Sequence, residues 1–302
     1  MALNYQLATA LLFSLLFSLS NCALVKEQPL VLKYHNGALL KGNVAVNLIW
    51  YGKFTPIQRS IIVDFVNSLS PSSPSQPQPS TSSWWATTEK YSARTRSLPS
   101  SALKINHQIL HEEYTLGKVL RSTHLLALSS KVNPAGNNTI NVVLTAGDVA
   151  VDGFCSGRCG THGVLRGGSG AYVWVGNPES QCPGYCAWPF HQPMYGPQTP
   201  PLTAPNGDVG VDGMVITLAS LLANTVTNPF RGGYFQGPVT APLEAASACT
   251  GKFGPGSYPG YPGNLLIDKV TGASFNAYGA HGRKFLLPAM WDPQLAACKT
   301  IG

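Results

Sequence analysis

The sequence predicts an α+β fold in which helices pack on a mixed sheet, followed by a loop-rich C-terminal part that is linked by disulfides. Apolar, strand-like runs alternate with segments of helical periodicity over residues 44–176. Six of the seven cysteines follow residue 150. Beyond Pro229 the chain is rich in glycine and proline turns such as GPGSYPGYPG. These observations favour regular structure in the first half of the chain and disulfide links in the glycine- and proline-rich second half.

The N-terminus predicts a secretory signal peptide over residues 1–23. An apolar run from Leu7 to Leu19 precedes small and polar residues, and the first charged residue is Lys26. The segment before the run lacks Lys and Arg, which leaves a buried N-terminal helix as the alternative. Cleavage near Cys22 or Ala23 would leave residues 24–302 as a single secreted domain without a transmembrane anchor.

The composition suits a protein outside the cell. Charged residues make up 11% of the chain, against about 25% in ordinary globular proteins. The net charge of +7 favours attraction to polyanions, which in a wall or matrix are acidic polysaccharides. Nucleic acid is disfavoured as a partner by the compartment and by the scattered basic residues. Asn137, in the sequon NNT, is the expected site of N-glycosylation.

The first half of the chain predicts most of the regular structure. Residues 44–52, VAVNLIWYG, predict a buried strand, and residues 55–70 begin with Thr-Pro and place apolar side chains at helical spacing. The Pro/Ser-rich stretch 71–83 predicts a surface loop, and WWATTEKYS after it predicts a short helix whose tryptophans pack on the domain. Further strands are expected at 102–114, 139–151 and 171–176, and further helices at 119–128 and 243–249.

Residues 211–229, VDGMVITLASLLANTVTNP, predict a buried core helix. No charged side chain occurs from Gly213 to Phe230. The apolar run of eleven residues from Gly213 to Ala223 is nevertheless shorter than the roughly 20 residues that a bilayer demands. Asp212 is the expected N-cap of this helix, and Pro229 is expected to close it.

The cysteines that remain after signal cleavage predict three disulfides. The spacing of CSGRC and CPGYC also resembles a zinc site, but an oxidising compartment favours disulfides. Bridges between these two motifs and bridges from them to the C-terminal cysteines both fit the spacing, so the pairing stays open. The residues concerned are Cys155, Cys159, Cys182, Cys186, Cys249 and Cys298.

Common catalytic motifs are incomplete in this chain. His107 and His111 lie four residues apart, but Gln108 stands where a zinc-binding H-E-x-x-H helix has its general base, and the local alternation favours a strand. GGSGA lacks the last glycine of the nucleophile elbow of serine hydrolases. No pair of carboxylates is visibly placed for glycoside hydrolysis.

Several long blocks carry a resemblance to a known family. They include WWATTEKY, CSGRCGTHG, YVWVGNPESQCPGYCAWPFHQPMYGPQ, NGDVGVDGMVITLASLLANTVTNPFRGGYFQGP and NAYGAHGRKFLLPA. Together these blocks resemble the plant EXORDIUM family, also called phosphate-induced protein 1, over nearly the whole mature chain. The resemblance implies a secreted protein of the apoplast or cell wall that takes part in cell expansion and growth, linked to brassinosteroid and nutrient status. It implies no established enzymatic activity and no cofactor.

A second resemblance concerns the predicted core helix. Zincin metalloproteases hold zinc on a core helix that reads His-Glu-x-x-His or His-Glu-x-x-Glu. Aligning TNP with a Thr-Asp-Pro ending places Ser220, Leu221 and Asn224 at the first ligand, the catalytic glutamate and the next ligand. Leu221 cannot accept a proton from a metal-bound water, and Ser220 with Asn224 would make a poor zinc site. The resemblance therefore implies a zincin-like scaffold without its metal, with Glu244 as a candidate surviving ligand position or else an exposed helical residue.

The sequence thus predicts a non-catalytic, secreted protein that promotes growth by binding a wall component or receptor, with acidic polysaccharide as one expected ligand. The alternative is an enzyme, either a cryptic metallohydrolase or a wall-polysaccharide hydrolase.

Overall fold

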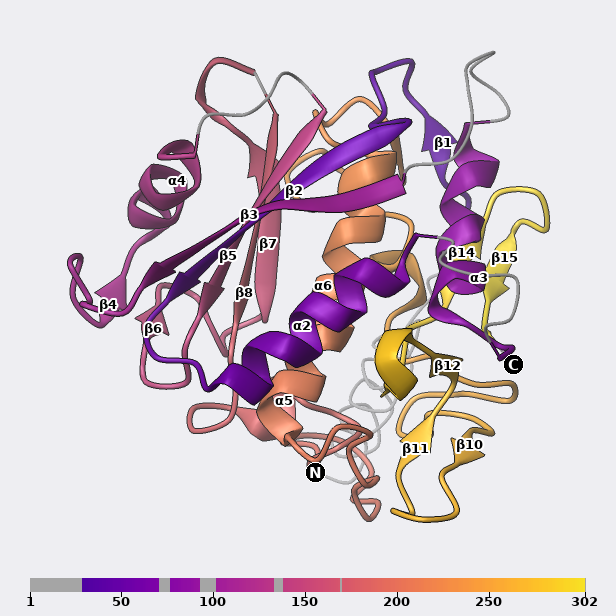
Figure 1. Cartoon of the computed structure of the whole chain (residues 1–302). Coiled ribbons are helices and arrows are strands. Elements are labelled where there is room, and N and C mark those ends of the chain that lie inside the picture. Colours follow the sequence, from indigo (N-terminus) through magenta and orange to yellow (C-terminus); the bar gives the residue numbers. More distant parts are fainter. Residues whose placement is uncertain (1–28, 71–76, 93–101, 133–137, 169, 302) are drawn as a thin grey trace, which may run out of the picture. The chain divides into compact units, whose positions relative to one another are not determined.

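The structure is a computed structural model that describes residues 29–70, 77–92, 102–132, 138–168 and 170–301 (Figure 1). The chain divides into two compact units, Met1–Leu30 and Val31–Gly302, and the fold described below belongs to the second. The predicted signal peptide and the sequon at Asn137 lie outside the described residues.

A five-stranded sheet forms the centre of the second unit (Figure 1). Its strand order is β3-β2-β5-β8-β7, and the first four strands are parallel while β7 runs antiparallel to β8. Val46 pairs with Ile140, which pairs with Ala171 on the next strand. Strands β2 and β5 are almost wholly buried, as expected of parallel strands covered on both faces. The strands are β2 (Asn43–Tyr51), β3 (Ala102–His111), β5 (Thr139–Thr145), β7 (Gly160–Val164) and β8 (Ala171–Gly176).

Helices cover both faces of this sheet. In Figure 1, α4 (Ser122–Ser130) lies on one side of the sheet, and α2 (Pro56–Ser68) and α6 (Val209–Thr227) lie together on the other. Thr55 caps α2, as the Thr-Pro entry predicts. Its hydroxyl accepts a hydrogen bond from Gln58 N, and the side-chain amide oxygen of Gln58 accepts one from Thr55 N. The α+β class with helices packed on a mixed sheet is confirmed.

The core helix α6 is confirmed, but its expected N-cap is wrong. Asp208 caps the helix by accepting a hydrogen bond from Val211 N at 2.9 Å. Asp212 lies in the first turn, buried, and accepts hydrogen bonds from Asn206 N and Nδ2 instead. The helix is long and apolar enough to cross a membrane, yet 72% of its most apolar window is buried inside the domain. This burial explains the missing charge, since all but one narrow face of α6 packs on other elements.

Boundaries differ from the prediction where short turns intervene. The strand expected over 139–151 ends at Thr145, and Ala150–Val151 forms β6, which pairs in parallel with β4 (Val119–Leu120). The short helix expected around Trp84 divides into α3 (Thr81–Trp85) and a 3-10 segment, η1 (Ala86–Tyr91). Both tryptophans are buried, and Trp84 Nε1 donates to Pro288 O at 2.7 Å, so their predicted packing role is confirmed.

The C-terminal part consists of loops and two-stranded ribbons. The helix expected over 243–249 is wrong, because Leu243 bridges Gln236 as an extended residue and only η4 (Ser247–Cys249) is helical. The ribbons pair β1 (Lys33–Tyr34) with β9 (Tyr234–Phe235), β10 (Leu266–Ile267) with β11 (Ser274–Phe275), β12 (Ala277–Tyr278) with β13 (Lys284–Phe285), and β14 (Met290–Asp292) with β15 (Ala297–Lys299). Three further short helices are α5 (Pro183–Cys186), η3 (Arg166–Gly168) and η5 (Ala280–Gly282).

Three disulfides link this loop-rich part, as predicted. The two C-x3-C motifs are bridged to each other through Cys155–Cys182 and Cys159–Cys186. The third bridge, Cys249–Cys298, joins η4 to β15. The alternative in which the motifs pair with the C-terminal cysteines is therefore wrong. The paired bridges hold the loop that leads into β7 against α5.

Candidate ligand-binding cavity

Helix α6 and the edge strand β7 lie close together at Gly160 of β7, which has no side chain to separate them. A Cβ on Gly160 would lie 2.7 Å from Leu221 Cδ1 and 2.4 Å from Trp174 O. The close approach brings Leu221 and Asn224 of α6 to the same cavity as β7. Ser220 is not among the residues that line it, and its Oγ donates to Ile216 O in the preceding turn. Two of the three helix positions that the zincin alignment singles out, Leu221 at the catalytic glutamate and Asn224 at a ligand, therefore line one cavity.

This cavity, called the α6–β7 cavity below, measures about 440 Å³. It lies between β7, the C-terminal end of α6 and the loop that precedes η4. Among its lining residues are Arg158, His162, Leu221, Asn224, Arg231 and Glu244. A volume of this size suits a small ligand or one or two units of a polymer.

A histidine–glutamate pair lies in the wall of the cavity. His162 Nε2 is 2.8 Å from Glu244 Oε2, and both side chains are mostly buried. The carboxylate can only accept, so the hydrogen bond between the two groups is donated by Nε2. Nδ1 is buried and has no hydrogen-bond partner among the described residues. Glu244 is thus a buried loop residue rather than the exposed helical residue that the sequence left as the alternative.

Two asparagines fix the loop that carries Glu244. Asn228 Nδ2 donates to the second carboxylate oxygen, Glu244 Oε1, at 2.7 Å, and Asn228 Oδ1 accepts from Gly233 N. Asn224 Oδ1 accepts from Ala246 N at 2.8 Å. Glu244, Asn224 and Asn228 are each less than 5% exposed. Both oxygens of Glu244 and the carbonyl oxygen of each asparagine are already engaged in intramolecular hydrogen bonds. These residues therefore stabilise the loop of Glu244 against α6 and β7.

Two guanidinium groups give the cavity a positive charge. Arg158 and Arg231 both line it, and Arg158 Nη2 donates to Asp152 O at 2.6 Å. Both lie near the Tyr172 hydroxyl: burial raises the pKa of Tyr172, while the positive charges of Arg231 and Arg158 act in the opposite direction. Among the described lining residues, Glu244 is the one carboxylate. The cavity therefore favours an anionic ligand.

The donor set limits the chemistry that this cavity can perform. A glycoside hydrolase needs a second carboxyl group across from the first, and the described residues supply none here. A catalytic zinc site takes three protein ligands, whereas His162 and Glu244 provide two. No group of three or more His, Cys, Asp or Glu side chains arranged to hold a metal occurs in the part of the chain that the structure describes. Among the described residues, His162 and Glu244 therefore do not complete either kind of site.

Comparison with known proteins gives the family. The family description "Phosphate-induced protein 1 conserved region" matches residues 32–301. The chain is 63% identical to Protein EXORDIUM-like 2 of Arabidopsis thaliana over all of both chains. It is 59% identical to Protein PHOSPHATE-INDUCED 1 of Nicotiana tabacum, covering 92% of this chain and 91% of the relative. Protein EXORDIUM of Arabidopsis thaliana is 61% identical, with 90% of this chain and 89% of the relative covered.

The chain belongs to the EXORDIUM (phosphate-induced protein 1) family. No solved structure matches it. The family match extends across α6, β7 and the loop of Glu244, so the whole α6–β7 cavity lies within the EXORDIUM conserved region. The resemblance seen in the sequence blocks is confirmed.

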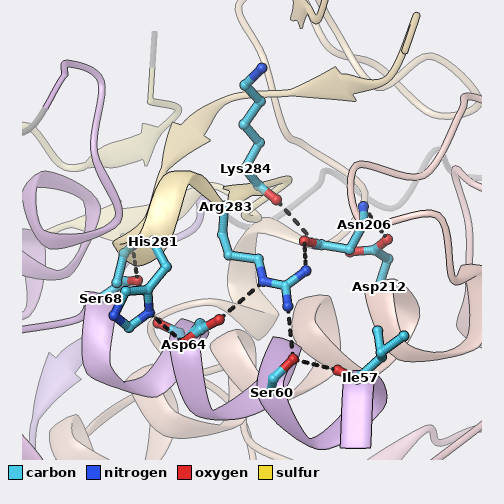
Figure 2. A network of polar contacts seen from close by, with 10 residues as sticks. Ile57, Ser60, Asp64, Ser68, Asn206, Asp212, His281, Arg283 and Lys284 are labelled. Carbon is cyan, nitrogen blue, oxygen red and sulfur yellow. Dashed lines mark hydrogen bonds and ion pairs between the residues drawn. The ribbon is translucent and has the colours of Figure 1, made fainter. Parts of the chain in front are cut away.

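A second polar cluster in this EXORDIUM protein lies at the other end of α6 (Figure 2). Asp64 of α2 contacts His281 Nδ1 at 2.8 Å and Arg283 Nε at 3.1 Å. Arg283 also donates to Ser60 Oγ and Asn206 Oδ1, and Asn206 in turn donates to Asp212. Burial raises the pKa of Asp212 to about 7 even though the hydrogen bonds from Asn206 oppose that rise. The cluster ties the C-terminal part to α2 and α6.

Sequence reasoning missed His162, Arg158 and Arg231 as neighbours in one site of this EXORDIUM protein. The segment GTHGV of β7 has two glycines and no apolar run, so it gave no strand signal. The one available signal was the histidine in GTHGV, directly after the cysteine motif CSGRC. This signal does not show that His162 contacts Glu244, so it could not identify the site by itself. His107 and His111 lie on strand β3, as their alternation predicted.

Proposed function

We propose that this protein is secreted to the apoplast or cell wall and promotes cell expansion and growth, linked to brassinosteroid and nutrient status, by binding an acidic wall polysaccharide rather than by catalysis. Support for secretion comes from the apolar N-terminal run of the sequence and from the three disulfides. Support for the role in growth comes from the family resemblance.

The observation that carries the proposal is the composition of the α6–β7 cavity. Its single described carboxylate, Glu244, is held on both oxygens by His162 and Asn228. In the zincin alignment, Leu221 stands at the position of the catalytic glutamate. A carboxylate with both oxygens engaged in this way is poorly placed to protonate a leaving group or to activate water, which supports binding over catalysis.

The arginines give the ligand its class. Guanidinium groups pair with carboxylates through two parallel hydrogen bonds, and uronic acid polymers carry one carboxylate per sugar. Arg158 and Arg231 line the same cavity, and the whole chain has a net charge of +7. Long-range attraction would bring the polymer to the protein, and the two arginines would select its carboxylates.

Titration of the secreted protein with hexagalacturonate, followed by calorimetry, tests this function. Arg158→Gln and Arg231→Gln are each expected to weaken binding about fivefold to tenfold, because each removes a charge-assisted hydrogen bond. Arg166→Gln is the matched control, since Arg166 is exposed on η3 and does not line the cavity. Binding should also weaken as salt rises. Affinity that is indifferent to salt and to both cavity variants would contradict the proposal.

Two measurements distinguish the binding function from the enzymatic alternative. If the protein only binds, incubation with polygalacturonate should release no reducing ends, and metal analysis of the purified protein should find no stoichiometric zinc. Stoichiometric zinc in the wild-type protein would favour the metallohydrolase and overturn the binding function.

We further propose that the scaffold is zincin-like. Support comes from a core helix that presents Leu221 and Asn224 to one cavity, with Glu244 reaching the same cavity from a later loop. A variant carrying Ser220→His, Leu221→Glu and Asn224→His tests this ancestry by its zinc content, with the wild-type chain as control. A folded variant that takes up no zinc would leave α6 as a core helix and no more.

A further inference from the structure

Two further cavities lie in the loop-rich part, and neither Arg158 nor Arg231 lines them. They measure about 440 and 400 Å³ and share two residues, Trp188 and Gly260. We call the surface that they form the Trp188 platform. Aromatic rings surround it, with Tyr261 lining one cavity and Tyr185 and Tyr195 lining the other.

Trp188 is held in place while part of it stays accessible. One side of the side chain packs against a small core cluster, where its ring centroid lies 5.6 Å from that of Phe253. The disulfide Cys159–Cys186 fixes the chain two residues before it. All six tryptophans lie in the described residues, and the other five are 4% exposed or less. Trp188 is therefore the tryptophan that a ligand can reach.

The tyrosines of the platform face solvent. Tyr195 is 77% exposed and Tyr185 is 37% exposed. Tyr261 is fixed by its hydroxyl, which donates to Asn264 Oδ1 at 2.9 Å, and by backbone hydrogen bonds with Tyr258 in both directions. Exposed aromatic rings on a pinned loop lose little conformational freedom when a ligand stacks on them, so such a surface is ready to bind.

The charge of the lining identifies the class of ligand. No Asp, Glu, Lys or Arg occurs among the described residues that line either cavity, although the chain carries 20 basic and 13 acidic side chains. The polar groups present are the imidazole of His191 and hydroxyls and amides such as Thr199, Thr250 and Asn264, which both donate and accept hydrogen bonds. Such a lining complements an uncharged ligand that combines apolar faces with hydroxyl groups.

We propose that the Trp188 platform binds a neutral polysaccharide chain, with the CH faces of successive pyranose rings stacked on Trp188 and the platform tyrosines. A polyproline peptide is the competing occupant of an aromatic groove. Such a peptide offers carbonyl acceptors and no N–H donors, so it would leave the accepting hydroxyl oxygens of Thr199 and Thr250 unused. Sugar hydroxyls match both kinds of group. The site would let one protein hold a neutral chain and an acidic chain at the same time.

Acrylamide quenching of tryptophan fluorescence tests the proposal on the intact secreted protein. Cellohexaose and mannohexaose serve as neutral probes, and hexagalacturonate and a proline decamer as competitors. A neutral hexasaccharide is expected to protect the fluorescence from quenching, because Trp188 supplies the accessible fraction. The protection should be the same at low and high salt, since no ionic contact is involved.

Two variants locate the binding. Tyr195→Ala and Tyr185→Ala are each expected to weaken the neutral hexasaccharide about fivefold to tenfold, and both side chains are exposed enough to be removed without loss of the fold. Leu295→Ala, which deletes a side chain 64% exposed outside both cavities, should leave the affinity unchanged. Arg158→Gln should also leave it unchanged, so failure of the acidic site and failure of this site are distinguishable.

The opposite results would overturn the proposal. Protection by the proline decamer alone would assign the platform to a peptide, and protection by hexagalacturonate that salt abolishes would assign it to anions. No protection by either neutral hexasaccharide, or equal affinity of the tyrosine variants and Leu295→Ala, would show that the platform does not bind a neutral chain.

Discussion

Glu244 illustrates how much a single residue depends on its surroundings. Beside one more carboxylate or two more imidazoles it would be a catalytic acid or a metal ligand, but here it is fixed by His162, Asn228 and its own backbone N–H, which donates to Ser247 Oγ. A buried carboxylate must be compensated, and the contacts of His162 and Asn228 with its two oxygens provide that compensation. The residue that resembles catalytic machinery in the sequence therefore holds the cavity wall together.

Asp212 makes stability depend on pH. Its pKa is raised to about 7 in the folded protein, chiefly by burial, and is near its ordinary value when the chain is unfolded. Between pH 4 and pH 7 the folded state holds a proton that the unfolded state has released, so the free energy of unfolding falls as pH rises, by up to about 4 kcal/mol over this window. Unfolding by guanidinium at pH 4.5 and pH 7.5 measures the fall.

The matched variant for this prediction is Asp212→Asn, which has no proton to lose. We expect its stability to be much flatter over the same window than that of the wild type, whatever its stability at pH 4.5. Parallel pH profiles for the two proteins would show that Asp212 is ionised throughout and that the prediction is wrong.

At the scale of elements, the predictable parts are those whose local signal agrees with their burial. Strands β2 and β8 are apolar runs because both of their faces are covered. The start of α2 could be predicted from its Thr-Pro sequence. Strand β7 gives no such signal, since GTHGV is an edge strand held by pairing with β8. The helix expected over 243–249 is wrong because an irregular loop buries Ala245, Ala246 and Cys249, while Leu243 remains 43% exposed.

The close packing of β7 on α6 requires a glycine at position 160. In Gly160→Ala the new methyl group would lie 2.4 Å from Trp174 O, a backbone atom of the central sheet that cannot move aside cheaply. We expect a loss of about 2 to 3 kcal/mol of stability, as in an overpacked core, together with weaker hexagalacturonate binding. Thermal unfolding and calorimetry report the two effects.

Gly147→Ala is the control for this change. A Cβ there would meet its nearest neighbour, Ser180 Oγ, at 3.6 Å, an ordinary contact. Equal stabilities of the two alanine variants would show that β7 can shift away from α6.

At the scale of the whole molecule, the candidate site could not be predicted because its parts are distant in sequence. His162 and Glu244 are separated by 82 residues, and their pairing depends on the sheet order, on α6 and on an irregular loop. The three predicted positions that line one cavity, Leu221, Asn224 and Glu244, came from the zincin resemblance rather than from local pattern. Long-range packing decides such contacts, and single-residue periodicity carries no information about it.

The bridge Cys249–Cys298 attaches the end of the chain to the molecule. It closes a loop of 49 residues, and in the chain-entropy account a loop of that size stabilises the fold by about 4 kcal/mol. Cys249→Ser with Cys298→Ser is expected to lose a large part of that amount in guanidinium unfolding. Binding of hexagalacturonate should persist under native conditions, because neither cysteine lines the α6–β7 cavity. Loss of that binding in a folded variant would contradict the separation of the two regions.

Arg158 lies inside the segment that two other bridges clasp, between Cys155 and Cys159. Both half-cystines are joined to the segment around α5, so two covalent bonds hold the short loop that carries Arg158 at the wall of the cavity. We therefore expect the oxidised protein to bind the acidic polymer of the proposed function more tightly than the reduced protein does.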